Sequence, residues 1–397
     1  MTKYVIIGNG VAGDSAARTI LSVDEDARVS VITDEDIPFY HRPRLIDLLA
    51  GRSNLEEIIL HSQDWYDERG VKLKIDSKAV NIDPERKTVE TSNGDIFKFD
   101  KLLLATGSRP RLPPITGKNK RNIFVLRKYK DVNKIAAVAD KSSTAVVIGG
   151  GLLGLETAAA LQERNLNVVV VEKLPQILGR QLDREGASLL QGILEDCGFQ
   201  FMLDSSVQEL TGGGEVRGVV LDKGHELTTD LVIIAAGVKA NLGLAEGLGL
   251  DIDTGIEVDH HLETSRTDIW AAGDVIKYGA NTFGTWPPAR EQGEIAGANM
   301  AGGERKYEGT LQTYRLKVPG VDLLSIGTLN TSGPEKAKIN LDRQEQVYRK
   351  ITLDQEQKIM GAILLGNTSE WSGIVRAVRN RSNFAEIEKG SEWRTEV

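Results

Sequence analysis

The sequence contains a single cysteine, Cys197, and this scarcity removes several kinds of site at once. One thiol cannot form an intrachain disulfide, a dithiol redox centre, a Cys-ligated iron–sulfur cluster or a structural zinc site. A lone thiol also fits a reducing compartment. We therefore expect Cys197 to be a small packed residue with no redox role.

Excess positive charge and long apolar runs are also missing. The 397 residues carry 49 Lys and Arg against 57 Asp and Glu, a net charge of -8 that argues against nucleic acid as a partner. No apolar run reaches the roughly 18 residues of a membrane span. The opening residues MTKYVIIGNG enter a strand too early for a signal peptide. We expect a cytoplasmic protein without nucleic-acid or membrane partners.

Glycine is abundant, and it marks an internal repeat. The segment KYVIIGNGVAGDSAA recurs as TAVVIGGGLLGLETAA, so that Gly8 corresponds to Gly149. Each copy reads as a β-branched strand, a glycine turn and an Ala/Leu-rich helix. A second strand then ends in acid, at Asp34 and Glu35 after the first copy and at Glu172 after the second. The pattern predicts two dinucleotide-binding α/β units.

The three glycines of such a motif have separate tasks. The first makes the turn, the second admits a pyrophosphate at the helix N-terminus, and the third lets the helix pack on the strand. These positions are Gly8, Gly10 and Gly13 in the first copy and Gly149, Gly151 and Gly154 in the second. The acid that follows would accept hydrogen bonds from a ribose. Two dinucleotides in one chain are expected to react with each other, and a flavin with a nicotinamide is the pair that can.

Four segments then carry a family resemblance: GNGVAG, GGGLLGLE, LLLATGSRPR and DIWAAGDV. With them the chain resembles the pyridine nucleotide-dependent FAD flavoprotein reductases over nearly its whole length. The resemblance implies an α/β fold with two Rossmann-like domains, for FAD and NAD, and a small C-terminal α+β domain. The expected ranges are 1–112 with 240–308 for FAD, 113–239 for NAD(P)H and 309–397 for the C-terminal domain.

The segment FYHRPRLIDLLAG separates the branches of this family. Disulfide reductases carry two cysteines there and the peroxidase and oxidase branch one, whereas this chain has none. It is most similar to the NADH:rubredoxin and flavorubredoxin reductases. That similarity implies electron transfer from NADH, with NADPH less favoured, through FAD to a small rubredoxin-, ferredoxin- or flavoprotein-type acceptor. A non-catalytic FAD/NADH sensor, an NADH oxidase and a nitrite-reductase-associated reductase remain as alternatives.

The resemblance also assigns site residues. Leu152 takes the gating position over the flavin, Glu156 lies close to the nicotinamide amide, and Lys317 completes the catalytic set. Besides the glycines, the FAD contacts are Asp34, Glu35, Arg42, Val80, Ala105, Thr106, Gly107, Arg111, Gly273, Asp274, Trp286 and Ala289. The further NAD contacts are Leu153, Glu172, Gly237 and Lys173, whose charge partly offsets the preference of Glu172 for NADH. We expect no metal site, because the adjacent His260 and His261 would diverge from an extended stretch.

One departure from the branch concerns position 47, where several members have a Lys that pairs with the Glu of the second motif. Here the two residues are Asp47 and Glu156, so that ion pair cannot form. Two carboxylates would repel unless one keeps its proton or a cation intervenes, and Arg44 or Lys317 could be that cation. Arg42 and Arg111 should neutralise FAD oxygens. Arg44, Arg109 and Lys317 would remain as docking charges for an acidic acceptor.

Overall fold

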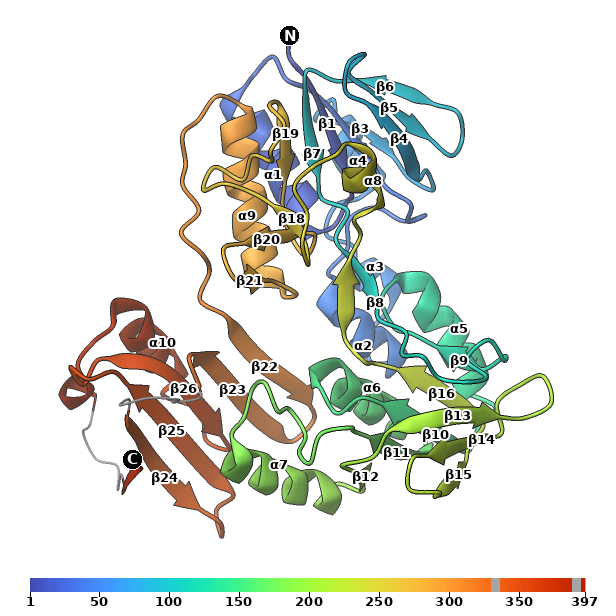
Figure 1. Ribbon diagram of the computed structural model, residues 1–397, viewed down its shortest axis with the longest axis vertical. Helices are drawn as coiled ribbons and strands as arrows, with labels where there is room; N and C mark the ends of the chain where they lie inside the picture. The colour runs from blue at the N-terminus through green and yellow to red at the C-terminus, as the bar shows by residue number, and fades with distance from the viewer. Residues whose placement is uncertain (330–335, 388–393, 397) are drawn as a thin grey trace.

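The computed structural model has three lobes, each built around its own sheet (Figure 1). It describes residues 1–329, 336–387 and 394–396. The N-terminus lies at the far end of the first lobe, and the C-terminus lies in the third. Among the described helices, none combines the length and the apolarity needed to cross a membrane.

The first lobe holds a parallel sheet in the order β19-β7-β1-β2-β3. The strands are β1 (Lys3–Ile7), β2 (Arg28–Ile32), β3 (Lys72–Lys74), β7 (Lys101–Leu104) and β19 (Ile269–Ala271). Apolar, often β-branched side chains fill β1 and β7, and both are almost completely buried because they lie inside the sheet. The last strand comes from residues far along the chain, so the first lobe is built from two separate segments.

Two helices pack tightly on this sheet, α1 (Val11–Val23) and α9 (Trp286–Met300). Glycine makes their close approach possible, because a Cβ at Gly293 would come 2.2 Å from the Ala12 carbonyl oxygen. Beside them, β4 (Ala79–Asp83), β5 (Thr88–Thr91) and β6 (Ile96–Lys98) form the antiparallel sheet whose hairpin the sequence predicts at Asn93-Gly94. Gly94 has φ +79°, as a tight turn requires.

The second lobe repeats the arrangement with the order β12-β11-β10-β16-β9. Its strands are β9 (Ile123–Phe124), β10 (Thr144–Ile148), β11 (Asn167–Val171), β12 (Gln200–Met202) and β16 (Leu231–Ile234). The helices are α5 (Tyr129–Ala139), α6 (Leu152–Gln162) and α7 (Arg184–Asp196), and a three-stranded sheet is formed by β13 (Val207–Thr211), β14 (Gly218–Leu221) and β15 (Glu226–Thr228). The antiparallel ribbon of β8 (Ser108–Pro110) and β17 (Val238–Ala240) connects the first two lobes.

The third lobe is an antiparallel sheet in the order β22-β23-β26-β25-β24-β27, with α10 (Trp371–Asn380) packed on it. Its strands are β22 (Thr313–Val318), β23 (Val321–Gly327), β24 (Lys336–Asp342), β25 (Val347–Leu353), β26 (Ile359–Leu365) and β27 (Arg394–Glu396). The predicted fold class is confirmed, while the domain boundaries stay a prediction.

A short segment of the first lobe crosses to the other two. Residues 42–58 form η1 (Arg42–Arg44), α2 (Leu45–Leu49) and α3 (Leu55–Ile58). The apolar side chains of α2 belong to the same buried cluster as Leu155 of α6 and Leu316 of β22. At the edge of this contact, Arg52 of the first lobe forms an ion pair with Glu163 of the second. The three lobes therefore meet in one shared core, and the candidate site lies beside it.

Candidate functional site

The first glycine turn has the geometry of a diphosphate cradle. Gly8 has φ +112°, and a Cβ there would come 2.1 Å from the Ala105 carbonyl oxygen. A Cβ on Gly13 would come 1.9 Å from the carbonyl oxygen of Gly8, so both positions require glycine. Gly10 is the N-cap of α1 and has open space around it, with no side chain capping the helix. These free N–H groups fit the diphosphate of FAD.

The second glycine turn has the same geometry. Gly149 has φ +120° and packs on the Ala235 carbonyl, while a Cβ on Gly154 would come 1.9 Å from the Gly149 carbonyl oxygen. Gly151 caps α6 and again has open space around it. Leu152 begins the helix half-buried, and Leu153 is exposed. The second cradle is thus equally ready for a dinucleotide.

The acidic residues that follow β2 in the first unit and β11 in the second have different hydrogen-bond partners. Glu35 accepts hydrogen bonds from Arg42 at 2.5 Å and from the Tyr40 hydroxyl at 2.7 Å. Burial raises the pKa of Tyr40, so its hydroxyl stays protonated and keeps donating to Glu35. Asp34 lies further out and pairs with Lys128 at 2.8 Å. Glu35 is therefore the acid beside the first cradle, in contact with Arg42 as an FAD site would need.

In the second unit Glu172 is bound by backbone. Its carboxylate accepts the Gly150 N–H at 2.6 Å and the Leu174 N–H at 2.8 Å. These bonds fix the carboxylate at the mouth of the glycine turn and leave lone pairs for a ribose hydroxyl. Lys173 is exposed, and Gly237 adopts φ +89° just after β16.

Asp274 lies in a polar cluster on the wall of the first cradle. It accepts hydrogen bonds from Ser108 Oγ and from the Arg127 guanidinium, each at 2.8 Å. Arg111 was expected to supply positive charge to FAD, but its side chain is exposed and its backbone N–H donates to Gly237. Arg127 is the cation that the structure brings to Asp274. No motif surrounds Arg127, so the sequence offered no signal for it.

The remaining predicted FAD contacts surround this cluster, with one exception. Thr106 and Asn241 exchange hydrogen bonds at 3.1 and 2.8 Å, and Gly107 has φ +63°. Gly273 has φ +87° and donates its N–H to Gln292. Val80 is the exception in that its side chain is 49% exposed at a β-bulge of β4, and its contact with FAD stays a prediction.

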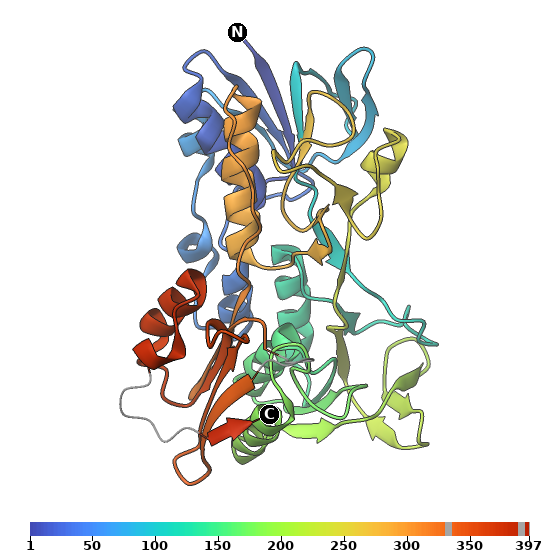
Figure 2. The same cartoon turned by 60° about the vertical axis from the view of Figure 1, so that its left-hand side comes forward.

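The start of α9 faces the junction of the lobes (Figure 2). Trp286 stacks on Phe39 with ring centroids 5.8 Å apart and meets the His41 ring edge-on at 4.7 Å. The N-cap Thr285 does not cap the helix, and its buried hydroxyl has no hydrogen-bond partner among the described residues. Ala289 is buried one turn further along. Because Pro287 and Pro288 have no N–H, this helix start could offer a flavin carbonyl the Trp286 N–H and the positive end of the helix dipole.

Asp47 and Glu156 each have a partner of their own, although the charge of Asp47 still adds to the effect of burial in raising the pKa of Glu156. Asp47 pairs with Arg52 at 2.9 Å and with Arg44 at 3.5 Å. Glu156 accepts the backbone N–H of Lys317 at 2.9 Å. Burial raises the pKa of Glu156 to about 7 although Lys317 opposes the shift. Sequence reasoning named Arg44 and Lys317 as candidate cations but missed Arg52.

Lys317 joins all three lobes. It lies on β22 of the third lobe, its backbone N–H reaches Glu156 of the second, and its ammonium donates to the Pro43 carbonyl of the first at 3.2 Å. Burial lowers the pKa of nearby His41, and the charges of Lys317 and Arg44 lower it further. A neutral His41 next to Trp286 adds no positive charge of its own to this part of the site.

Other expectations need correction or addition. Cys197 is exposed at the C-cap of α7, whereas the sequence suggested a packed residue. The His260 and His261 rings lie 4.2 Å apart because the chain turns there, so they do not diverge. Even so, no metal-binding group of His, Cys, Asp or Glu occurs among the described residues. Sequence reasoning also missed the buried Asp14, which bonds His61 at 2.7 Å under the first cradle.

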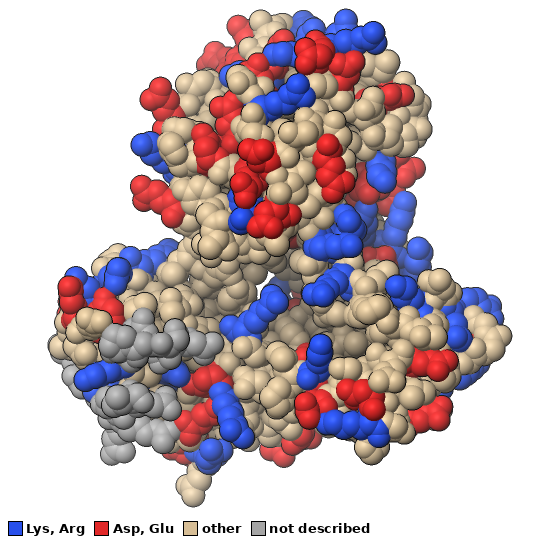
Figure 3. Space-filling view, in the orientation of Figure 1, with Lys and Arg blue, Asp and Glu red and all other residues tan. Residues whose placement is uncertain are grey.

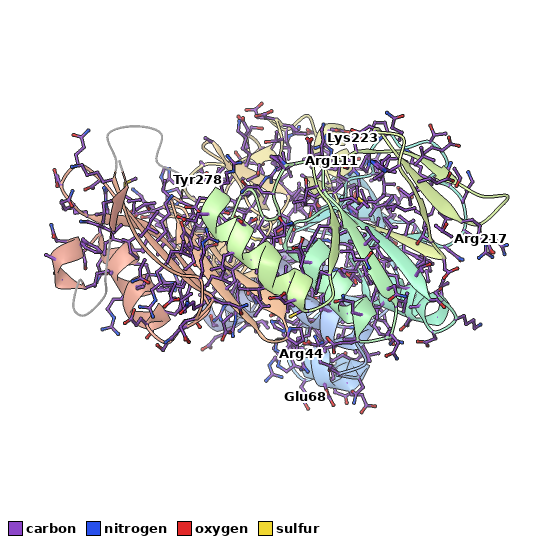
Figure 4. All side chains as sticks on the ribbon, turned by 90° about the horizontal axis from the view of Figure 1, so that it is seen from below. Arg44, Glu68, Arg111, Arg217, Lys223 and Tyr278 are labelled. Carbon is purple, nitrogen blue, oxygen red and sulfur yellow. The ribbon has the colours of Figure 1, made fainter. Side chains whose placement is uncertain are left out.

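The predicted docking charges do not form one surface. Arg44 is held by Asp47, Ser53 and the Glu57 carbonyl, and Lys317 is tied to Pro43. Figure 4 shows Arg44 and Arg111 on opposite faces of the molecule.

The two cradles with the joint between them can bring two dinucleotides together. When bound, FAD would accept a hydride from a nicotinamide and release electrons singly. Residues of this chain would hold the diphosphates at the two helix N-termini, Glu156 lies at the joint, and the start of α9 would point at the flavin edge. Buried walls around Trp286 and α2 exclude water there.

Comparisons with known proteins agree with this geometry. Residues 2–293 match the family model of the pyridine nucleotide-disulphide oxidoreductases, and residues 313–382 match the rubredoxin NAD+ reductase C-terminal domain. An NADH-rubredoxin oxidoreductase of Clostridium acetobutylicum is 32% identical over 97% of both chains. The solved NADH:rubredoxin oxidoreductase of that organism is 31% identical, with a TM-score of 0.81 over 98% of this chain and 97% of that one.

A nitrite reductase of Bacillus subtilis is 35% identical over 98% of this chain but only 48% of its own length. The chain likewise spans about half the length of two further curated relatives, the assimilatory nitrate reductase electron transfer subunit of Bacillus subtilis and the NADH nitrite reductase large subunit of Escherichia coli. Those longer proteins therefore contain parts that have no counterpart in this chain.

Proposed function

The chain belongs to the pyridine nucleotide-disulphide oxidoreductase family, and from this premise we propose that it passes electrons from NADH through FAD to a small redox protein such as rubredoxin. Membership confirms the family resemblance, the enzyme class of a nicotinamide-dependent flavoprotein reductase, and FAD with NADH as cofactors. The acceptor, the site residues and the cytoplasmic location stay proposals.

One observation carries the proposal: the flavin pocket has no thiol. The stretch that begins at Tyr40 and His41 contains no cysteine, and Cys197 is exposed at the end of α7. In a reductase without a thiol relay, the reduced flavin has to pass its electrons directly to an acceptor that is a separate molecule. The match of residues 313–382 to a rubredoxin reductase C-terminal domain supports a rubredoxin-type carrier.

The test is anaerobic reduction with NADH followed by stopped-flow mixing with rubredoxin, ferredoxin or flavodoxin. Rapid reoxidation of the flavin by one carrier is the expected result, and Cys197→Ser should reoxidise within about twofold of the parent because an exposed residue tolerates this change. Reoxidation by oxygen alone would favour an NADH oxidase. Slow reoxidation by every acceptor would favour the sensor.

A second candidate rests on the nitrite reductase relatives. The part of these relatives that the chain matches supports this candidate, an NADH-dependent electron supply to nitrite reduction. NADH-dependent nitrite reduction by the protein with a nitrite-reducing partner would support it further, whereas rubredoxin turnover without nitrite reduction would exclude it.

A further inference from the structure

The interdomain ribbon carries positive charge on one face. In the register of β8 with β17, Lys239 lies directly opposite Arg109, and the Arg111 N–H continues the ladder to Gly237. Alternation along a strand puts Arg109, Lys239 and Arg111 on the same side. All three residues are exposed. Ser108, on the other side, is buried against Asp274.

Like charges directly opposite each other destabilise a strand pair. Arg109 donates only to neutral acceptors, the Ala240 carbonyl and the Asn241 side chain, so its charge persists. Within the described part of the chain, neither Arg109 nor Arg111 nor Lys239 has an acidic partner in an ion pair. Three unpaired cations on so short a ribbon repel one another and lower the stability of the isolated protein. An anionic partner that binds there would remove this repulsion.

The position of this face also matters. The ribbon borders the opening between the first and second lobes, where Figure 3 shows Lys and Arg side chains gathered. It is one residue from Ser108, which contacts Asp274 on the FAD wall. The whole chain has a net charge of -8, so an acidic partner needs a local cluster of cations such as this one to approach it.

We propose that this face, defined by Arg109, Arg111 and Lys239, is the docking surface for an acidic electron-carrier protein. The inference rests on the proposed function and names the surface at which its acceptor arrives. It replaces the earlier set of Arg44, Arg109 and Lys317, of which only Arg109 lies here. Docking charges of this kind steer the encounter and leave hydride transfer unaffected.

The test uses the FAD-loaded protein and Lys239→Glu. This reversal converts the repulsive pair with Arg109 into an attractive one, so the melting temperature should stay equal or rise. In contrast, kcat/KM for oxidised rubredoxin should fall about fivefold to tenfold at low ionic strength, and the difference should shrink towards 1 M salt, where screening acts within about 3 Å. Arg109→Glu/Lys239→Glu should lower it further.

The matched control is Lys134→Glu on α5, an exposed lysine whose reversal changes the net charge equally. It should leave rubredoxin turnover unchanged. An uncharged acceptor, 1,4-benzoquinone, should be reduced alike by all variants, and the KM for NADH should not move. Ferricyanide is a poor control because its own negative charge responds to the same field.

The outcomes separate the two proposals. Unchanged rubredoxin turnover in both ribbon variants, or a raised KM for NADH alone, overturns the docking surface and leaves the reductase function standing. A parent protein that reduces benzoquinone but none of rubredoxin, ferredoxin and flavodoxin also overturns the docking surface. A parent protein that reduces neither quinone nor carrier overturns the proposed function itself.

Discussion

In both dinucleotide-binding units a Cβ on the third glycine would come 1.9 Å from the carbonyl oxygen of the first, yet their surroundings differ. Around the first cradle, Glu35 and Asp274 are each bound by an arginine, and α9 closes over α1. Around the second, Glu172 is bound only by backbone N–H groups. The first unit suits a cofactor that stays, and the second suits one that enters and leaves.

The largest expected effect is on stability and comes from the third glycine of each motif, where the two units have the same close contact. Gly13→Ala should give no folded protein, a loss of about 4 kcal/mol or more, because the Gly8 carbonyl cannot move away. Gly10→Ala is the matched control: it meets open space and should fold, but it should lose FAD, since the added methyl occupies the place of the diphosphate. Thermal unfolding and flavin content measure both, and an equal loss of stability would contradict this division of roles.

Asp274→Ala should impair cofactor binding by the first unit and leave the second unit unaffected. Removing this carboxylate takes away the acceptor proposed for hydroxyl groups of FAD and releases Arg127 from its position, so the affinity for FAD should fall more than a hundredfold, about 3 kcal/mol, and the protein should purify nearly colourless. Absorbance at the flavin band relative to protein measures this. Arg127→Ala should behave similarly and Arg111→Ala should not. Full flavin content in the Asp274 variant would remove Asp274 from the site.

The joint between the units can be tested by the pH dependence of stability, because Glu156 lies there. Burial raises its pKa from 4.5 to about 7, so the folded protein binds a proton that the unfolded chain has already released. Between pH 4.5 and 7 the free energy of unfolding should therefore fall as pH rises, by about 3 kcal/mol relative to Glu156→Gln. Denaturant unfolding of both proteins at pH 5 and 8 gives the difference. Parallel pH profiles would show that Glu156 ionises normally.

The smallest effect should come from Glu172, which sharpens the second half of the comparison. Glu172→Gln keeps an acceptor for the Gly150 N–H but removes the charge that repels a 2'-phosphate. The ratio of kcat/KM for NADH to that for NADPH should fall about tenfold while flavin content is unchanged. Lys173→Gln should instead move the ratio towards NADH. A parent enzyme equally efficient with both nucleotides would show that Glu172 does not contact the ribose.

Much of the site could be predicted because its signals are local. The contact of Gly13 with the Gly8 carbonyl and the open space around Gly10 lie within a single turn and its helix, and the structure has both, whereas Gly8 also packs on the distant Ala105 carbonyl. The failures concern pairs far apart in the chain. Arg127 meets Asp274 across 147 residues, and nothing in either neighbourhood encodes the other. Arg111, chosen from its motif, lies exposed on the ribbon, and its contact with FAD stays a prediction.

The sequence by itself determined the two cradles, the order of the lobes and the absence of a thiol near the flavin, since all three depend on residue type and short-range spacing. Only the tertiary structure decided which charged groups lie together and which protonation state they favour. Burial and partner choice set the state of Glu156 through a backbone N–H of Lys317, 161 residues away, and strand register placed Arg109 opposite Lys239. Electrostatic energies depend on distance and solvent exposure, and the folded chain alone fixes both.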